Sequence, residues 1–237
     1  MYFKYVSEIE KYLIPVTVGT MKEPRSLLDI APVMPIISVS NPASAVTVAR
    51  AINKAGLPLV QVALDTPDAL ESIERIAAEA PEVVVGAGEV TEVDQPAQAH
   101  SAGAEFLVAT HGTEPLRAAM ADTELPHLPA VTTATEATEL IEEGYTDMVL
   151  HPAAAVGGRQ NLRFLAAFVP AARFCPSGGI TAAQLTGYLA TPNVGCVSAD
   201  WLAPADAVRR RDWDRIGRLA DVAVKLSKPT VTAVSTL

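Results

Sequence analysis

The chain has 237 residues, of which 49% are hydrophobic and 5% aromatic, and its net charge is −9 at pH 7. This length suits one large domain or two small ones, and a (β/α)8 barrel of about 250 residues fits as one. The negative charge argues against nucleic acid or an anionic membrane as the main partner. No apolar run reaches the ~20 residues that span a bilayer, and no signal-peptide core opens the chain.

Three regions differ in pattern. Residues 1–25 form an N-terminal extension whose apolar spacing predicts a short helix, packed on the body or on a neighbouring subunit, with a lid as the alternative. Residues 26–226 carry a regular alternation, and residues 227–237 form a tail with no place in it. Two cysteines, Cys175 and Cys196, are too few for a disulfide framework and predict buried free thiols in a reducing cytoplasm.

Eight apolar runs of strand length alternate with helical patterns. The predicted strands are Val33–Val39, Leu59–Leu64, Glu82–Gly86, Phe106–Ala109, His127–Val131, Asp147–His151, Ala172–Cys175 and Val194–Ser198. The predicted helices are Asn41–Ala55, Thr66–Ala80, Thr91–Ala102, one from Thr113, Ala134–Glu143, Asn161–Phe168, Thr181–Leu189 and Trp213–Leu226. Such alternation requires parallel strands with helical crossovers, and eight units predict a closed (β/α)8 TIM barrel. A doubly wound open sheet is the alternative, but no G-x-G-x-x-G follows the first strand.

In a barrel of this kind, the loops after the strands share one mouth. The sequence sends polar or glycine-rich groups there from most strands: Gln61, Asp65, Glu89, His111, Thr132, His151, Ser177, Gly178, Gly179 and Asp200. The Ser177-Gly-Gly turn predicts an anion cradle, because its glycines expose N–H groups at the start of a helix. Asp65, Glu89, His111 and His151 form a candidate site for a divalent metal, with a wet polar pocket as the alternative.

Four motifs carry a resemblance to a known family: RFCPSGGI at Arg173–Ile180, VVGAGEV at Val84–Val90, TEPL at Thr113–Leu116 and WLAPADA at Trp201–Ala207. On these motifs, the stretch Ser26–Leu226 resembles the 2-keto-3-deoxy-6-phosphogluconate (KDPG) and 4-hydroxy-2-oxoglutarate (KHG) aldolases. The resemblance implies a class I lyase of carbohydrate metabolism on a TIM barrel, a homotrimer, and a small 2-keto acid as substrate.

This sequence departs from the family pattern at the positions of the catalytic and substrate-binding residues. Val149 stands where the family has the lysine that forms a Schiff base, and Gln61 stands where it has the glutamate that acts as general acid and base. Asp65 replaces the arginine that grips the substrate carboxylate, Glu89 replaces a threonine, and Asp200 ends the former phosphate-binding turn. An amide cannot move a proton at ordinary pH, and the added carboxylates repel a phosphate.

The nearest positive charge for an anion is Arg159, just after Gly157-Gly158. Two hypotheses stay open. One is a lyase that works without a Schiff base, with a divalent metal that polarises the ketone. The other is a catalytically inactive barrel that binds or senses a small molecule. The carboxylates and histidines at the mouth favour the lyase, in which His151 is the candidate for the replacement chemistry.

Overall fold

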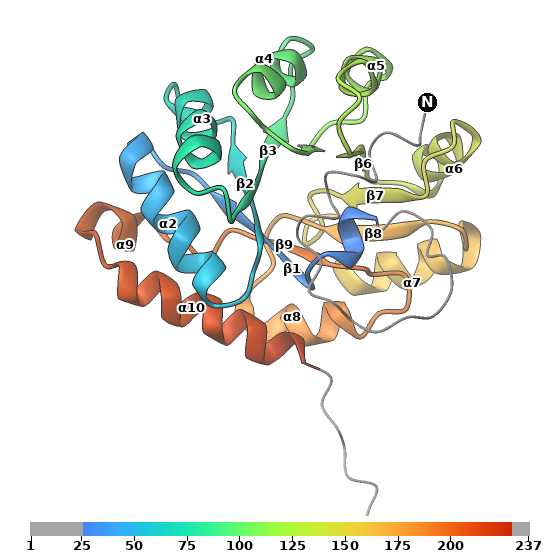
Figure 1. The fold of residues 1–237 in the computed structure, drawn as a ribbon. Helices are drawn as coiled ribbons and strands as arrows, with labels where there is room; N and C mark the ends of the chain where they lie inside the picture. The colour runs from blue at the N-terminus through green and yellow to red at the C-terminus, as the bar shows by residue number, and fades with distance from the viewer. Residues whose placement is uncertain (1–25, 229–237) are drawn as a thin grey trace, which may run out of the picture.

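The structure is a computed structural model that describes residues 26–228. The helix that the sequence predicts within residues 1–25 therefore lies outside the described residues, as does the tail from residue 229 onward. Helices surround a ring of strands in this part of the chain (Figure 1). None of the described helices is long and apolar enough to cross a membrane.

The strands are short and apolar, and they follow the prediction closely. They are β1 (Val33–Ile37), β2 (Leu59–Ala63), β3 (Val84–Val90), β4 (Leu107–Ala109), β5 (His127–Leu128), β6 (Ala130–Val131), β7 (Asp147–Leu150), β8 (Arg173–Pro176) and β9 (Val197–Ala199). Every recorded pairing is parallel. The hydrogen-bonded order is β5-β4-β3-β2-β1-β9 in one sheet and β6-β7-β8 in the other.

The two sheets together close a barrel. The predicted fifth strand is split into β5 and β6 at Pro129, which has no N–H to give to a ladder. Its carbonyl still accepts from the Val149 N–H at 2.8 Å, so pairing continues across the break. On the opposite side, Phe174 forms a parallel bridge with Val194. The prediction of an eight-unit (β/α)8 barrel is confirmed.

Most helices also match their predicted positions. They are α2 (Pro42–Lys54), α3 (Ala69–Glu79), α4 (Gln95–Ser101), α5 (Glu114–Asp122), α6 (Ala134–Glu142), α7 (Gly158–Phe168), α8 (Ala182–Leu189), α9 (Ala205–Arg210) and α10 (Trp213–Ser227), with a 3-10 turn, η3, at Leu27–Asp29. Two helix predictions differ from the structure. Helix α7 starts three residues before the predicted Asn161, because Gly157 and Gly158 adopt positive φ at its entry. Helix α9 was not predicted at all.

The G-A-G motif lies inside β3, not in a loop after the strand as the sequence indicated. A Cβ on Gly86 would lie 2.6 Å from the ring of Phe106, and one on Gly88 would lie 2.4 Å from Oε1 of Gln61. These two glycines therefore make room for side chains that fill the barrel. Glycine in a strand interior commonly marks such close approach.

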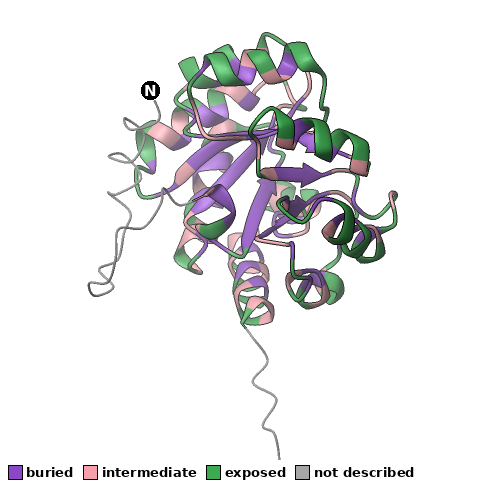
Figure 2. Cartoon of the chain, turned by 90° about the vertical axis from the view of Figure 1, so that its right-hand side faces the viewer, coloured by how far each residue is buried: buried purple, intermediate pink, exposed green. Residues whose placement is uncertain are grey.

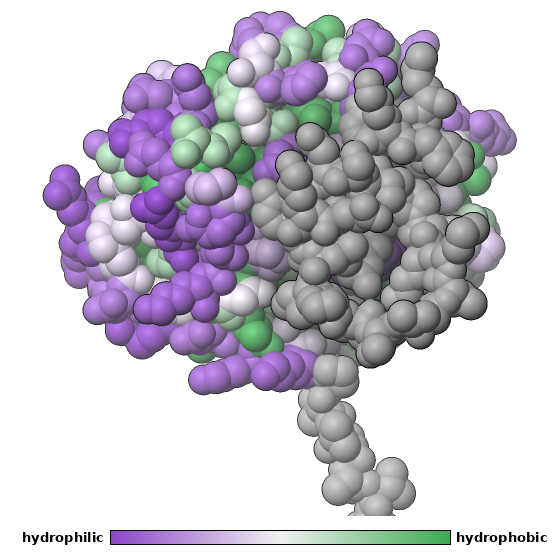
Figure 3. Space-filling view, viewed as in Figure 1, coloured by the Kyte–Doolittle hydropathy of each residue, from purple (hydrophilic) through white to green (hydrophobic). Residues whose placement is uncertain are grey.

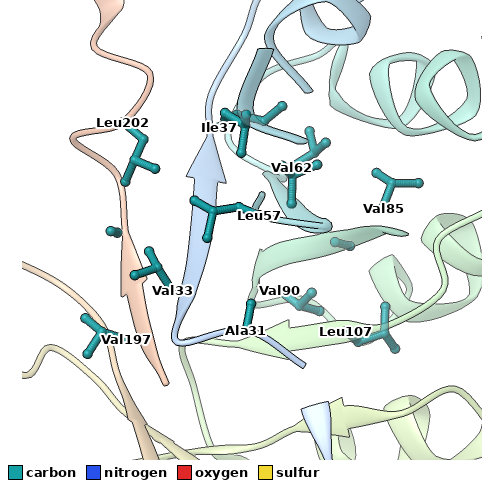
Figure 4. Packing of buried hydrophobic residues seen from close by; sticks show 14 of the residues in the cluster. Ala31, Val33, Ile37, Leu57, Val62, Val85, Val90, Leu107, Val197 and Leu202 are labelled. Carbon is teal, nitrogen blue, oxygen red and sulfur yellow. The ribbon is translucent and has the colours of Figure 1, made fainter. Parts of the chain in front are cut away.

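Two apolar clusters hold the fold together. The larger lies between strands and helices; Figure 4 shows part of it, with Val33 and Ile37 of β1 and Val62 of β2. The smaller fills the barrel and is made of Leu27, Leu28, Met34, Leu59, Phe106, Val108, Leu128, Ala130, Val149, Cys175 and Cys196. Leu27 and Leu28 enter it from η3. Figure 2 shows the strands buried and the outer helix faces exposed, and Figure 3 shows hydrophilic side chains on that outer surface.

We predict that Gly86→Ala destabilises the chain by about 1–3 kcal/mol, the usual cost of overpacking a filled core. Gly217→Ala is the matched control, because a Cβ there meets nothing within 4 Å and the position lies inside α10. It should stabilise by about 0.5–1 kcal/mol through helix propensity. Urea denaturation of both variants measures this; equal effects of the two substitutions would contradict the packing described for Phe106.

Candidate functional site

The predicted site residues lie at one end of the barrel, because each follows or ends a strand. Asp65 comes after β2, Glu89 is the penultimate residue of β3, His111 comes after β4, Thr132 after β6, His151 after β7, Ser177 after β8 and Asp200 after β9. The carboxyl ends of parallel strands meet at one mouth, where (β/α)8 barrels carry their sites. The sequence therefore placed these residues on the correct face.

Val149 lies below this mouth and is fully buried in the inner cluster. Its companions there include Phe106, Val108 and Cys175. The lysines of residues 26–228 stand elsewhere: Lys54 ends α2, while Lys225 lies in the last turn of α10 and Lys228 caps that helix. No lysine of the described chain reaches the barrel interior, so none of these amines stands near the position of Val149.

Gln61 is held inside the barrel by a polar chain. Its Nε2 donates to Oγ of Ser198 at 2.9 Å, and the same Oγ lies 3.2 Å from Sγ of Cys175. Gln61 is 1% exposed, and both of its partners are also buried. Buried polar groups are stable only when they are hydrogen-bonded, so this chain fixes the Gln61 amide. The sequence did not predict the roles of Ser198 and Cys175, since contacts across the barrel leave no local signal.

Three carboxylates face one another at the mouth. The Ser38 hydroxyl donates to Asp65, with Oγ 2.7 Å from Oδ2 and 2.9 Å from Oδ1. Glu89 lies at a register shift in β3 and has φ of 53°. Such a bulge re-aims the side chain that it carries. Burial raises the pKa of Glu89, and the charges of Asp65 and Asp200 raise it further. The sequence did not predict Ser38 as a residue of this site.

Two histidines form the other side of the mouth. Burial lowers the pKa of His151, and the nearby His111 lowers it further, while a backbone hydrogen bond with Ser177 acts in the opposite direction. The first two effects favour the uncharged imidazole of His151. His111 is exposed, and its Nδ1 lies 3.3 Å from Oγ1 of Thr110. His151 can thus accept or relay a proton without a fixed charge.

The donors at the mouth do not fit a metal ion. Within residues 26–228, no three histidine, cysteine, aspartate or glutamate side chains come together in an arrangement that could hold one. The predicted set of Asp65, Glu89, His111 and His151 therefore does not converge as a ligand group; Asp65 acts electrostatically on Glu89, and His111 acts on His151. The metal-assisted route finds no support in this arrangement.

Several predicted anion-binding residues also make close contacts within the fold. The N–H and Oγ1 of Thr132 both donate to Glu136, at 2.6 and 2.8 Å, as part of the entry to α6. Gly178 and Gly179 have positive φ and pack closely on the loop after β7: a Cβ on Gly178 would lie 3.2 Å from the His151 ring. Arg159 forms no ion pair with Asp200 or any other described carboxylate, so it does not compensate the acidic mouth.

The closed eight-unit barrel, with polar residues at the carboxyl ends of its strands, defines a (β/α)8 protein with a mouth of the type that enzymes use. A family model described as KDPG and KHG aldolase matches residues 25–219. The KHG/KDPG aldolase of Escherichia coli K12 is 38% identical over 203 residues, which cover 86% of this chain and 95% of that protein. The chain belongs to the KDPG/KHG aldolase family.

Solved structures of KDPG aldolases support the same family assignment. The KDPG aldolase of Zymomonas mobilis superposes with a TM-score of 0.80 at 34% identity, covering 87% of this chain and all of that one. The Legionella pneumophila KDPG aldolase, captured with pyruvate as a covalent carbinolamine intermediate, gives a TM-score of 0.80 at 32% identity, covering 83% of this chain and 95% of that one. The family assignment made from the four motifs is confirmed.

We predict that Glu89 makes the folded chain lose stability as pH rises. Its raised folded pKa means that the native state holds this proton more tightly than the unfolded chain does. The resulting stability is present below the unfolded pKa of about 4.3 and is lost as pH rises through the folded pKa. Glu89→Gln cannot ionise, so it should be more stable than the wild type at pH 7, by a few tenths to about 1 kcal/mol.

Urea denaturation at a series of pH values between 4 and 8 tests this expectation. Glu92→Gln is the matched control, because Glu92 is an exposed acid three residues along the chain. A Glu89→Gln variant that keeps the wild-type pH dependence, or that is less stable at pH 7, contradicts the acidic cluster.

Proposed function

We propose that this chain is a KDPG/KHG aldolase-family barrel that has given up the Schiff-base aldol cleavage and binds a small molecule at its acidic mouth. The observation that carries the proposal is Val149, a fully buried aliphatic side chain in the apolar filling of the barrel. A Schiff base needs a nucleophilic amine, and the aldol cleavage needs the resulting iminium as an electron sink.

Gln61 also supports the proposed loss of aldol cleavage. The proton transfers of an aldol cleavage need a group that ionises near neutral pH, and a carboxamide does not. The Gln61 amide is also engaged, since it donates to Ser198 in the barrel interior. Two inherited functions are thus replaced by packing and hydrogen bonding, which stabilise the barrel without chemistry.

The charge at the mouth bears on the ligand. The charges of Asp65 and Asp200 act on Glu89 and help to raise its pKa, after the larger effect of burial. A phosphate dianion placed among them meets repulsion of about 4 kcal/mol for each pair of unit charges at ~4 Å, even at an effective dielectric near 20. The preferred ligand is therefore a small unphosphorylated molecule, either neutral or with an amine. A 2-keto acid without a phosphate fits this limit only if its carboxylate binds away from Asp65.

A lyase that acts without a Schiff base is the second candidate, and one observation favours it. The pKa of Glu89 is raised and that of His151 is lowered, so both groups at this mouth favour their uncharged forms. Such pairs suit general acid–base catalysis, for example the enolisation of a small 2-keto acid. The homotrimer that the family resemblance implies stays a prediction under either candidate.

We predict that borohydride reduction in the presence of pyruvate leaves the mass of the wild-type protein unchanged, because no amine of the described chain stands in the barrel. Val149→Lys should gain a covalent pyruvate adduct under the same conditions, and Val149→Ala should not. Intact-protein mass spectrometry measures all three, with circular dichroism to check folding. A pyruvate adduct on the wild type, mapped by peptide analysis to a lysine within the barrel, contradicts the proposal.

Solvent exchange of the pyruvate methyl protons separates the two candidates. A binding protein leaves the exchange rate in D2O at its buffer value. An acid–base lyase raises it, and Glu89→Gln or His151→Ala then lowers it by about 100-fold or more. Proton NMR follows the methyl signal, with Glu92→Gln as the control that should not change the rate.

A further inference from the structure

A pocket with a volume of about 370 Å³ lies between the start of α7 and the helix α8. It is lined by Ala154 and by six residues that carry the argument: Gly157, Gly158, Arg159, Gln160, Gln184 and Tyr188. None of the mouth residues lines it, and no carboxylate does. This pocket therefore shares no lining residue with the acidic mouth and lacks its negative charge, although its Ala154 adjoins Gly179.

Tyr188 gives the pocket a hydroxyl group. The residue is only 4% exposed, and no side-chain hydrogen bond found within residues 26–228 involves its hydroxyl. The hydroxyl lies over Gly158 at the pocket wall, where an added Cβ would come within 2.6 Å of it. The hydroxyl is not one of the buried polar atoms that lack a partner, so it opens to the pocket and can donate its proton to a group bound there.

Arg159 brings a positive charge to the same place. Its guanidinium lies on the face of α8 that Gly187 leaves bare, since a Cβ on Gly187 would be 2.7 Å from one of its terminal nitrogens. Burial raises the pKa of Tyr188, and the Arg159 charge partly offsets that effect, as expected for neighbouring groups. In the described part of the chain, no acidic side chain lies within 4.0 Å of this guanidinium, so its donors are available.

The backbone and one amide add further donors. The N–H groups of Gly158 and Gln160 bond to loop carbonyls, whereas that of Arg159 finds no backbone acceptor among the described residues. It stands in the first turn of α7, at the positive end of the helix dipole. On α8, Oε1 of Gln184 accepts from the N–H of Thr181 at 3.0 Å, which leaves the Gln184 NH2 group free to donate.

We propose that this pocket binds a small oxyanion through the Tyr188 hydroxyl, the Arg159 guanidinium and the first-turn N–H of α7. Its chemistry is that of a phosphoryl group, because a guanidinium beside a helix N-terminus matches several phosphate oxygens at once. The group is supplied by inorganic phosphate or by a phosphorylated small molecule. This site does not depend on what binds at the mouth, and it carries anion recognition on a chain whose mouth repels anions.

Titration of the full-length, nitrogen-15-labelled protein with inorganic phosphate tests the proposal, at constant ionic strength set with sodium chloride. Saturable amide shifts should appear at Gly157, Gly158, Arg159 and Gln160. Arg159→Gln should weaken binding by about ten-fold or more, and Tyr188→Phe by about three-fold or more. Arg163→Gln, an exposed arginine one turn further along α7, is the matched control and should stay within two-fold.

Gly187→Ala separates binding from stability. Alanine favours the helix, so the melting temperature should hold or rise, while the new Cβ displaces the Arg159 guanidinium and weakens phosphate binding. A second titration with glycerol phosphate identifies the source: tighter binding than inorganic phosphate indicates a phosphorylated molecule, and weaker binding indicates the free ion. The proposal is overturned if no shift saturates, if the shifts fall only on Ser177–Ile180, or if Arg159→Gln and Arg163→Gln weaken binding equally.

Discussion

The filling of the barrel interior is the constraint on which the rest of the structure depends. Eight short strands close only if their inward side chains occupy the space without voids. Here Phe106 takes the room that Gly86 leaves, Gln61 takes the room that Gly88 leaves, and Val149 packs among apolar neighbours. The Gln61–Ser198–Cys175 chain satisfies the polar groups of this filling. The barrel is thus built as a core, in which Val149 and Gln61 are fixed by packing and hydrogen bonding.

Negative and positive side chains lie in different places at the mouth end of the barrel. Acidic groups gather at the mouth around Glu89, and the positive Arg159 lies apart beside Tyr188. A mouth that repels phosphate and a pocket lined by donors together give the molecule two sites of opposite preference. Because the two sites share no lining residue, substitutions at one can be made without altering the groups of the other.

Much of this could be predicted from the sequence. The alternation of strands and helices fixed the fold, since parallel strands with helical crossovers have few arrangements. Asp65, Glu89, His151 and Asp200 were correctly sent to one mouth by their place after strand ends. What the sequence did not predict depends on contacts between distant segments. The burial of the G-A-G motif within β3 follows from Phe106 and Gln61, and the hydrogen bond from Ser38 to Asp65 joins two different strands.

The candidate metal ligands are a further feature that the sequence could not decide. Asp65, Glu89, His111 and His151 share a mouth, and residue type alone made them a plausible ligand set. In the described residues no three such donors converge, and the backbone at Glu89 departs from regular strand geometry, with a register shift and a positive φ. A motif read along the chain gives residue positions at a site, but not the distances between side chains that coordination requires.

The central claim, that Val149 removes the inherited reaction, is tested most directly by an assay of carbon–carbon cleavage. Purified protein is incubated with 2-keto-3-deoxy-6-phosphogluconate and, separately, with 4-hydroxy-2-oxoglutarate, and pyruvate release is followed with lactate dehydrogenase and NADH. The account predicts a rate equal to that of buffer for both compounds. Pyruvate release that rises in proportion to protein concentration, and that survives a chelator, contradicts it.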